Sequence, residues 1–190
     1  QRVSLIEYSA FFGSIQIFRY LYQNGVDLKP SLWFFAIHSN NANMIHILEE
    51  YQIIPQDDTF NQCLSESIQC FHNEIAYYIY DNHLQASNYY HNYEEQLIEN
   101  YNFEFLNENI LESNDSFGLL CSYDYFSLVK ILINDSKMLI NKNEDNDTPL
   151  NLAIEKGNIE IIKLLLEQKD LDINLKSIIN FSFKWYLLHK

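Results

Sequence analysis

The clearest hydrophobic pattern in the chain is the stretch DTPLNLAIEKGNIEIIKLLLE, at positions 147–167. Within it, Leu150, Ala153 and Ile154 are spaced i, i+3, i+4, which places them on one face of a helix. Thr148 is a favourable N-cap, and the proline after it is tolerated at the first helical position because its missing N–H would be unpaired there anyway. The pattern therefore predicts a short amphipathic helix that begins after Thr148.

A second helix is predicted directly after the first. Gly157 ends the first helix, since glycine adopts the left-handed conformation without a Cβ penalty, and Asn158 can cap the next one. The run from 159 to 167 is apolar around most of its circumference, so it must be buried on more than one side. Two short helices cannot hide that much apolar surface alone, and neighbouring hairpins must stack on them.

Copies of this helix pair recur along the chain. Aligning the apolar runs predicts a break between paired helices at six positions: Gly13, Asn40, Phe71, Tyr101, Asp124 and Gly157. The copies ending near residues 24 and 134 match best, and the copy around Tyr101 matches least, so the register between residues 82 and 114 stays open.

This pattern resembles the ankyrin repeat family, which has a TPL opening, a glycine between helices and a leucine pair at the close. Asn151 and Asn146 replace a usual histidine and a usual turn glycine of that family. The resemblance implies an all-α ankyrin-repeat solenoid of about six stacked helix pairs with short hairpin fingers. It implies a single domain over 1–190, with repeats near 1–27, 28–56, 57–87, 88–112, 113–141 and 142–174 and a partial or capping helix at 175–190. The abundance of Asn, Tyr and Ile resembles the divergent ankyrin repeats of protists.

Charge and cysteine content narrow the partners and the compartment. Asp and Glu number 26 against 12 Lys and Arg, a net charge of −14, which disfavours nucleic acid and anionic membrane and favours a basic or neutral protein partner. The alternative is that the charge serves solubility alone. No apolar run is long enough to span a membrane, and three cysteines in predicted helices indicate reduced thiols in the cytoplasm or nucleus. The absence of an initial Met favours a piece of a longer protein.

The sequence offers no set of catalytic residues. The four glycines are too far apart for a phosphate-binding loop, and neither a nucleophile motif nor a paired-cysteine motif occurs. The histidines are scattered, with His38 and His46 on opposite sides of a predicted break, so they indicate no metal site. We therefore expect no enzyme activity, no cofactor and no metal.

The family resemblance implies that a partner protein binds a concave strip formed by the finger tips and the exposed side of each first helix. Mapped onto this chain, the strip contains Phe11, Phe12, His38, Ser39, Gln69, Cys70, Glu99, Asn100, Ser122, Tyr123, Glu144, Asp145, Asp147, Glu155 and Lys156. Phe11 and Phe12 have an alternative role, in which they pack against another repeat or are buried. The alternative function is a structural spacer or self-association segment of a longer protein, monomeric or weakly associating through its ends near Phe11 and Trp185.

Overall fold

Short helices make up the computed structural model, which describes residues 2–57, 59–84, 93–104, 114–134, 140–141 and 147–175. Within these ranges there is no β-strand, which confirms the predicted all-helical class. The chain divides into two compact units, residues 1–105 and 106–190, and each is described by itself. In the described part, no helix is long and apolar enough to cross a membrane.

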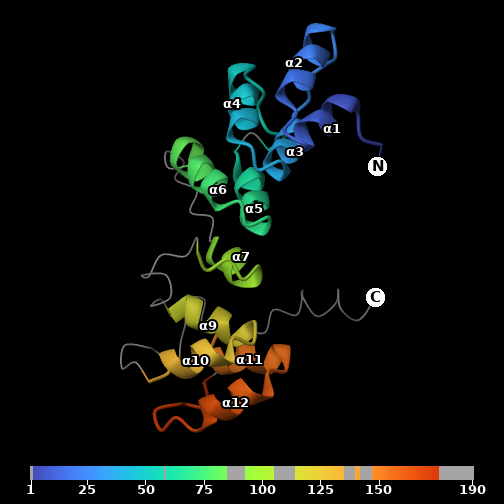
Figure 1. Cartoon of the computed structure of the whole chain (residues 1–190). Coiled ribbons are helices and arrows are strands. Elements are labelled where there is room, and N and C mark those ends of the chain that lie inside the picture. Colours follow the sequence, from blue (N-terminus) through green and yellow to red (C-terminus); the bar gives the residue numbers. More distant parts are fainter. Residues whose placement is uncertain are drawn as a thin grey trace. The chain divides into compact units, whose positions relative to one another are not determined.

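The N-terminal compact unit is a row of helix pairs. Its helices are α1 (Leu5–Phe11), α2 (Ile15–Gln23), α3 (Leu32–His38), α4 (Ala42–Glu50), α5 (Asn61–Gln69), α6 (Asn73–Ile79), the π-helical turn η1 (Tyr80–Leu84) and α7 (Tyr93–Glu99). The first helices α1, α3, α5 and α7 contact one another in that order, while α2, α4 and α6 each pack on their own first helix (Figure 1). This is the stacking that the apolar pattern predicts.

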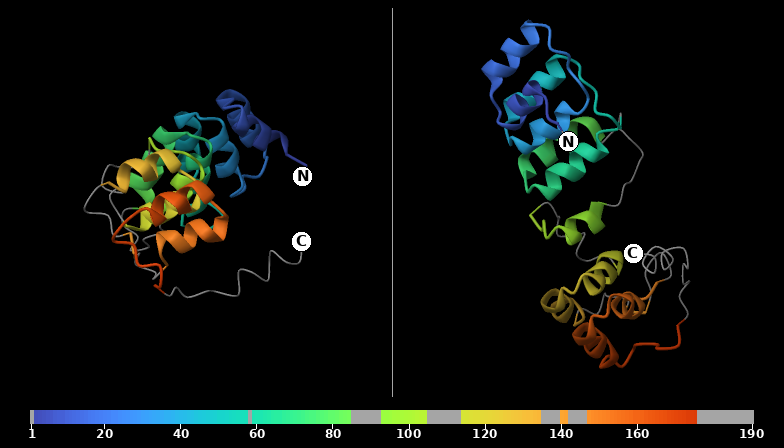
Figure 2. Two further views of the ribbon diagram at one scale, coloured as in Figure 1. Left: turned by 90° about the horizontal axis from the view of Figure 1, so that it is seen from below. Right: turned by 90° about the vertical axis from the view of Figure 1, so that its right-hand side faces the viewer.

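The C-terminal compact unit repeats the same arrangement. It contains α9 (Asn114–Ser122), α10 (Phe126–Leu132), α11 (Pro149–Lys156) and α12 (Ile159–Leu166). The first helices α9 and α11 pack together, as do the second helices α10 and α12, and each second helix contacts its own first helix (Figure 2).

Each helix pair turns at a residue in the left-handed conformation. Positive φ angles occur at all six predicted break positions: Gly13 (61°), Asn40 (49°), Phe71 (58°), Tyr101 (59°), Asp124 (63°) and Gly157 (78°). The predicted breaks are therefore confirmed, including the one at Tyr101. Four of these residues carry a side chain, which costs about 1–2 kcal/mol each in this conformation, so stacking must outweigh local preference.

In four of the repeats, the side chain directly after the break bonds to the preceding repeat. The Nδ2 atoms of Asn41, Asn102 and Asn158 donate to the carbonyl oxygens of Gly13 (3.4 Å), Ile68 (2.9 Å), and Cys121 and Ser122 (2.7 and 2.8 Å). The Nδ1 atom of His72 lies 2.8 Å from the carbonyl oxygen of Ile37. These bonds reach main-chain carbonyls at the end of a first helix or in the turn that follows it, and they fix the register between neighbouring repeats.

The helix starts and the small core residues agree with the sequence reading. The Thr148 hydroxyl accepts from the backbone N–H of Asn151 at 3.1 Å, and Pro149 begins α11. The core includes Ala10, Ala36 and Ala153, none of which exposes any surface, and this lets neighbouring helices approach closely. The predicted capping helix at 175–190 and the second helix of the fourth pair lie outside the described residues.

Candidate functional site

A continuous chain of aromatic rings lies on the surface of α1 and α3. The ring centroids of Tyr8 and Phe12 are 4.7 Å apart, those of Phe12 and Phe11 5.2 Å, those of Phe11 and His38 5.6 Å, and those of His38 and Phe34 4.6 Å. Tyr8, Phe11, Phe12 and Phe34 expose 56%, 40%, 59% and 48% of their surface. We call these five residues the aromatic ridge. Its rings contact one another yet stay open to solvent.

Helix geometry places the ridge. Tyr8 and Phe12 are four residues apart at the end of α1, and Phe34 and His38 are four apart on α3, so each pair shares one helix face. The opposite face of α1 carries Ile6, Ser9 and Ala10, all of them buried. Since α1 packs on α3, the two pairs meet through Phe11, whose ring stacks on His38.

A cluster of polar side chains joins the ridge to α5, the first helix of the third pair. The His38 Nε2 atom lies 2.8 Å from Glu66 Oε1, and the Cys70 Sγ atom lies 3.6 Å from His38 Nδ1 and 3.7 Å from Glu66 Oε1. All three side chains are half-buried. Burial raises the pKa of the Cys70 thiol, and the adjacent Glu66 carboxylate raises it further. Without another ligand, the thiol is therefore protonated at neutral pH.

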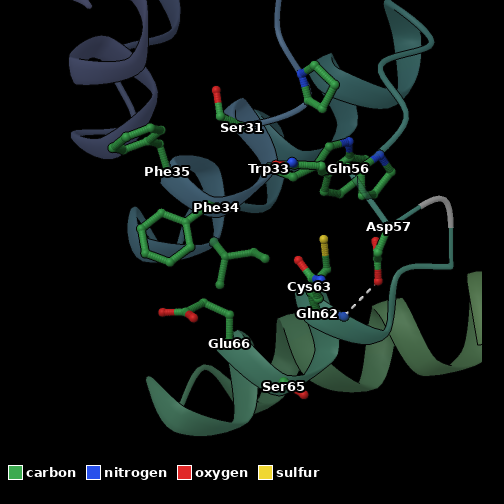
Figure 3. A pocket seen from close by; sticks show the side chains of 13 residues that line it. Ser31, Trp33, Phe34, Phe35, Gln56, Asp57, Gln62, Cys63, Ser65 and Glu66 are labelled. Carbon is green, nitrogen blue, oxygen red and sulfur yellow. Dashed lines mark hydrogen bonds between the residues drawn. The ribbon is translucent and has the colours of Figure 1, made fainter. Parts of the chain in front are cut away.

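An open groove of about 490 Å³ lies beside the ridge, between α3, α5 and the loops that precede them (Figure 3). Phe34 forms part of its wall, and Asp57 and Glu66 lie on opposite sides of it. Burial raises the pKa of Asp57, but hydrogen bonds from the Gln62 backbone N–H and the Thr59 hydroxyl outweigh this and hold the pKa below its ordinary value. The second carboxylate oxygen, Oδ1, is buried and has no hydrogen-bond partner among the described residues. Asp57 thus supplies an ionised carboxylate to the lining of the groove.

A second polar cluster lies on the second helices and has a structural role. The Glu49 carboxylate accepts from the Tyr78 hydroxyl at 2.9 Å and lies 2.9 Å from His83 Nε2 and 3.0 Å from His46 Nδ1. Burial raises the pKa of Glu49, but these three partners outweigh it and hold the pKa below its ordinary value. The same environment raises the pKa of Tyr78 to about 12, through burial and through its bond to Glu49. The cluster links α4 to α6 and η1.

The structure brings some predicted site residues together and separates others. Phe11, Phe12 and His38 meet in the aromatic ridge, so the alternative that the two phenylalanines are buried is wrong. In the C-terminal compact unit the Lys156 ammonium lies 5.8 Å from the centroid of the Tyr123 ring. The remaining predicted residues are exposed (Gln69, Glu99, Glu155) or half-buried (Ser39, Cys70, Asn100, Asp147).

The prediction that Ser122 lies on the exposed strip is wrong, because this residue is buried, with 8% of its surface exposed. It lies at the end of α9, where its carbonyl oxygen accepts the Asn158 amide of the next repeat. Glu144 and Asp145 lie outside the described residues.

Tyr8, Phe34 and Glu66 belong to this surface but are missing from the predicted set. The prediction took the last residues of each first helix, whereas the residue four positions earlier shares the same face. That spacing in the sequence could have identified Tyr8 from Phe12 and Phe34 from His38. The contact of His38 with Glu66 and Cys70 joins residues 28 and 32 positions apart, and local spacing carries no signal for it.

Comparison with known proteins identifies the fold and the family. The chain is similar to the crystal structure of the human ASB11 ankyrin repeat domain, with a TM-score of 0.58 at 16% identity, over 92% of this chain and 90% of that one. No match was found among curated proteins. Neither result bears on the predicted protist-type subgroup. A family model described as ankyrin repeats in three copies matches residues 82–177, just over half of the chain. With the left-handed breaks and the stacked helix pairs, this match shows that the chain belongs to the ankyrin repeat family.

Proposed function

We propose that this chain is a non-catalytic protein-interaction module that binds a partner protein on the face formed by its first helices and fingers, with the aromatic ridge as the main contact. Ankyrin repeats are generally protein-interaction modules and are typically non-enzymatic. The observation that carries the proposal is the ridge itself, because adjacent exposed aromatic side chains on a rigid scaffold are typical of interface hot spots.

The chemistry beside the ridge supports a partner that combines apolar and basic groups. Asp57 and Glu66 border the groove next to Phe34, and the chain carries a net charge of −14. A basic side chain in the groove would pair with the Asp57 or Glu66 carboxylate, while a neighbouring apolar side chain would pack on Phe34. A basic or neutral protein segment fits this surface better than nucleic acid, whose phosphates the net charge would repel.

Each compact unit contributes further residues to the proposed partner contacts. Gln69, Glu99 and Asn100 would continue it on α5 and after α7, and Tyr123 and Lys156 would supply a second aromatic and charged contact in the C-terminal compact unit. Three free cysteines support a reducing compartment, the cytoplasm or nucleus, as the place where binding occurs.

The test compares two surface variants with equal numbers of truncated apolar side chains. The ridge variant carries Phe11→Ser and Phe34→Ser, and the matched control carries Ile17→Ser and Tyr20→Ser on α2, where both side chains are more than half exposed. Proteins captured by the immobilised wild type are identified by mass spectrometry, and the affinity of a purified partner is then measured by calorimetry. Truncating a hot-spot aromatic costs about 1–2 kcal/mol, so the ridge variant should bind at least about tenfold more weakly while the control binds as the wild type does.

A partner that binds both variants with the affinity of the wild type contradicts the proposal. The salt dependence of the same titration tests the charge argument, since binding through Asp57 and Glu66 weakens as salt rises and purely apolar binding does not.

Self-association is a second candidate function, favoured by the outer side of the first helix pair. Leu5, Ile17 and Tyr20 expose 67%, 53% and 65% of their surface. Together with Tyr8 and Phe12 at its border, they form an apolar surface that another repeat could cover, which we call the end face. In solution, light scattering would then show a size that grows with concentration, and Leu5→Ser with Tyr20→Ser would abolish the growth. A constant monomeric size at all concentrations rules this candidate out.

A further inference from the structure

The polar cluster of His38, Glu66 and Cys70 has the composition of a metal-binding site. Glu66 lies on α5 and Cys70, four residues later, is the C-cap of that helix, so a carboxylate and a thiol lie about one turn apart on one side of it. His38, at the end of α3, supplies an imidazole from the neighbouring repeat. The ligand atoms of the three side chains all lie within 4.8 Å of one another. Two helices that pack together thus bring three donors of different types to one point.

The distances from the Cys70 thiol to one His38 ring nitrogen and to the Glu66 carboxylate are close to those in a tetrahedral zinc site. With Zn–S near 2.3 Å and Zn–N or Zn–O near 2.0–2.1 Å, two ligand atoms of a tetrahedral site lie about 3.3–3.6 Å apart. The Cys70 Sγ atom is 3.6 Å from His38 Nδ1 and 3.7 Å from Glu66 Oε1. Glu66 Oε1 contacts the other ring nitrogen of His38, Nε2, at 2.8 Å, which is a hydrogen-bond distance. Because an imidazole ligates through one nitrogen, a bound ion requires the His38 ring or the Glu66 side chain to rotate until the same nitrogen faces both the thiol and the carboxylate.

We propose that His38, Glu66 and Cys70 form a zinc site with three protein ligands and a fourth position open to water or to a side chain of a partner. Thiolate and imidazole select zinc over magnesium or calcium, which require oxygen donors. The Cys70 thiol gives up its proton to solvent as the ion binds. Phe11 and Phe34, which contact the His38 ring, provide an apolar shell that holds the imidazole in place.

The site has a structural consequence within the N-terminal compact unit. A bound ion joins α3 to α5, two first helices of successive repeats, next to both the aromatic ridge and the groove. It therefore stiffens the surface proposed for partner binding, yet it requires no partner to form. The test below measures metal binding only, so its result does not depend on the proposed partner binding.

Cobalt(II) is the probe, because a cobalt–thiolate bond produces near-ultraviolet charge-transfer absorption that oxygen and nitrogen ligands do not. The reduced wild-type chain is titrated with cobalt at neutral pH, and zinc is then added to displace it. We expect the absorption to saturate at one equivalent of cobalt and to disappear with zinc. Cys70→Ser should abolish it, and His38→Gln should weaken cobalt binding by at least about 100-fold, since even outer-shell partners of a metal ligand contribute 10–100-fold.

Two matched variants control for other donors. His46→Ala removes an exposed histidine on α4, and Cys121→Ala removes a buried thiol from the other compact unit, so both should keep the absorption of the wild type. Circular dichroism without metal establishes that each variant folds. A readout that needs no variant is the alkylation rate of Cys70 in the wild type, followed by peptide mass spectrometry, which zinc should slow at least about tenfold.

Two results overturn the proposal. One is a wild type that shows no charge-transfer absorption, or whose absorption survives Cys70→Ser. The other is an alkylation rate of Cys70 that zinc does not change.

Discussion

Replacing Gly13 by alanine should destabilise the N-terminal compact unit more than the same change at Gly25. Both glycines have positive φ angles, 61° and 83°, so both substitutions place an L side chain in the left-handed region. The surroundings differ. A Cβ at position 25 meets nothing within 4 Å, whereas a Cβ at position 13 would lie 2.9 Å from Nδ2 and 3.3 Å from Cβ of Asn41.

The expected magnitudes follow from these contacts. Left-handed strain of about 1–2 kcal/mol, offset by about 0.4–1 kcal/mol of lost freedom in the unfolded chain, gives roughly 1 kcal/mol for Gly25→Ala. At position 13, Asn41 must also move, although its Nδ2 donates to the Gly13 carbonyl and its Oδ1 accepts from the Asn43 backbone N–H at 3.0 Å as the cap of α4. Losing a weak hydrogen bond and an N-cap adds about 1–2 kcal/mol, so we expect roughly 2–3 kcal/mol for Gly13→Ala.

Urea unfolding measures both values, with tryptophan fluorescence as the signal. The chain has two tryptophans, so a Trp185→Phe background leaves the buried Trp33, which belongs to the same compact unit as both glycines. Adding Asn41→Ala to each glycine variant completes a double-mutant cycle, and it should lower the cost of Gly13→Ala but not that of Gly25→Ala. Equal costs at the two positions, or a cycle without coupling, would refute the argument that the repeats are held in register at Asn41.

Three further outcomes are expected. Asn158→Ala removes two hydrogen bonds to the preceding repeat and should lower the unfolding free energy of the C-terminal compact unit by about 1–3 kcal/mol, measured by urea unfolding, with no effect if those carbonyls find water instead. The folded-state pKa of Glu49 is lowered, so its contribution to stability is complete above its ordinary pKa of 4.5 and is lost as the pH falls through the lower folded-state pKa. In Glu49→Gln, the unfolding free energy, measured by urea unfolding at several pH values, should therefore fall less steeply below pH 4.5. In the metal-free chain, an alkylating reagent should modify Cys70 well before Cys63 and Cys121, because burial raises the pKa of those two thiols to about 12 and encloses them; equal rates by mass spectrometry would contradict this.

The helix breaks could be predicted from sequence because the apolar pattern on either side of them repeats along the chain. Gly157 between two apolar runs predicts a turn by its conformational freedom, and counting back from it locates Phe71 and Tyr101, which have no turn preference of their own. Those two residues adopt positive φ because the helices on either side must stack on their neighbours. The periodic apolar pattern therefore located breaks that residue type alone would have missed.

The surface could not be predicted to the same depth, because its contacts join residues from different repeats. That Phe11 is exposed and stacks on His38 depends on how α1 and α3 pack, which no spacing within either helix determines. The burial of Ser122 has the same origin, since the next repeat reaches its carbonyl oxygen through Asn158.

The residues that follow three of the breaks connect the helix pattern to the surface chemistry. Asn41, His72 and Asn102 each bond a carbonyl of the repeat before, so each first helix is held at a set height against its neighbour. This register determines which residues at the ends of the first helices lie side by side, and so it places His38 beside both Phe11 and Cys70. The surface chemistry of this stack is thus a consequence of its register. A substitution at Asn41 or His72, neither of which belongs to the ridge, should weaken partner binding and metal binding together. A substitution of Tyr8 or Phe12, whose rings pack on each other and not on His38, should weaken partner binding and leave the metal affinity close to that of the wild type.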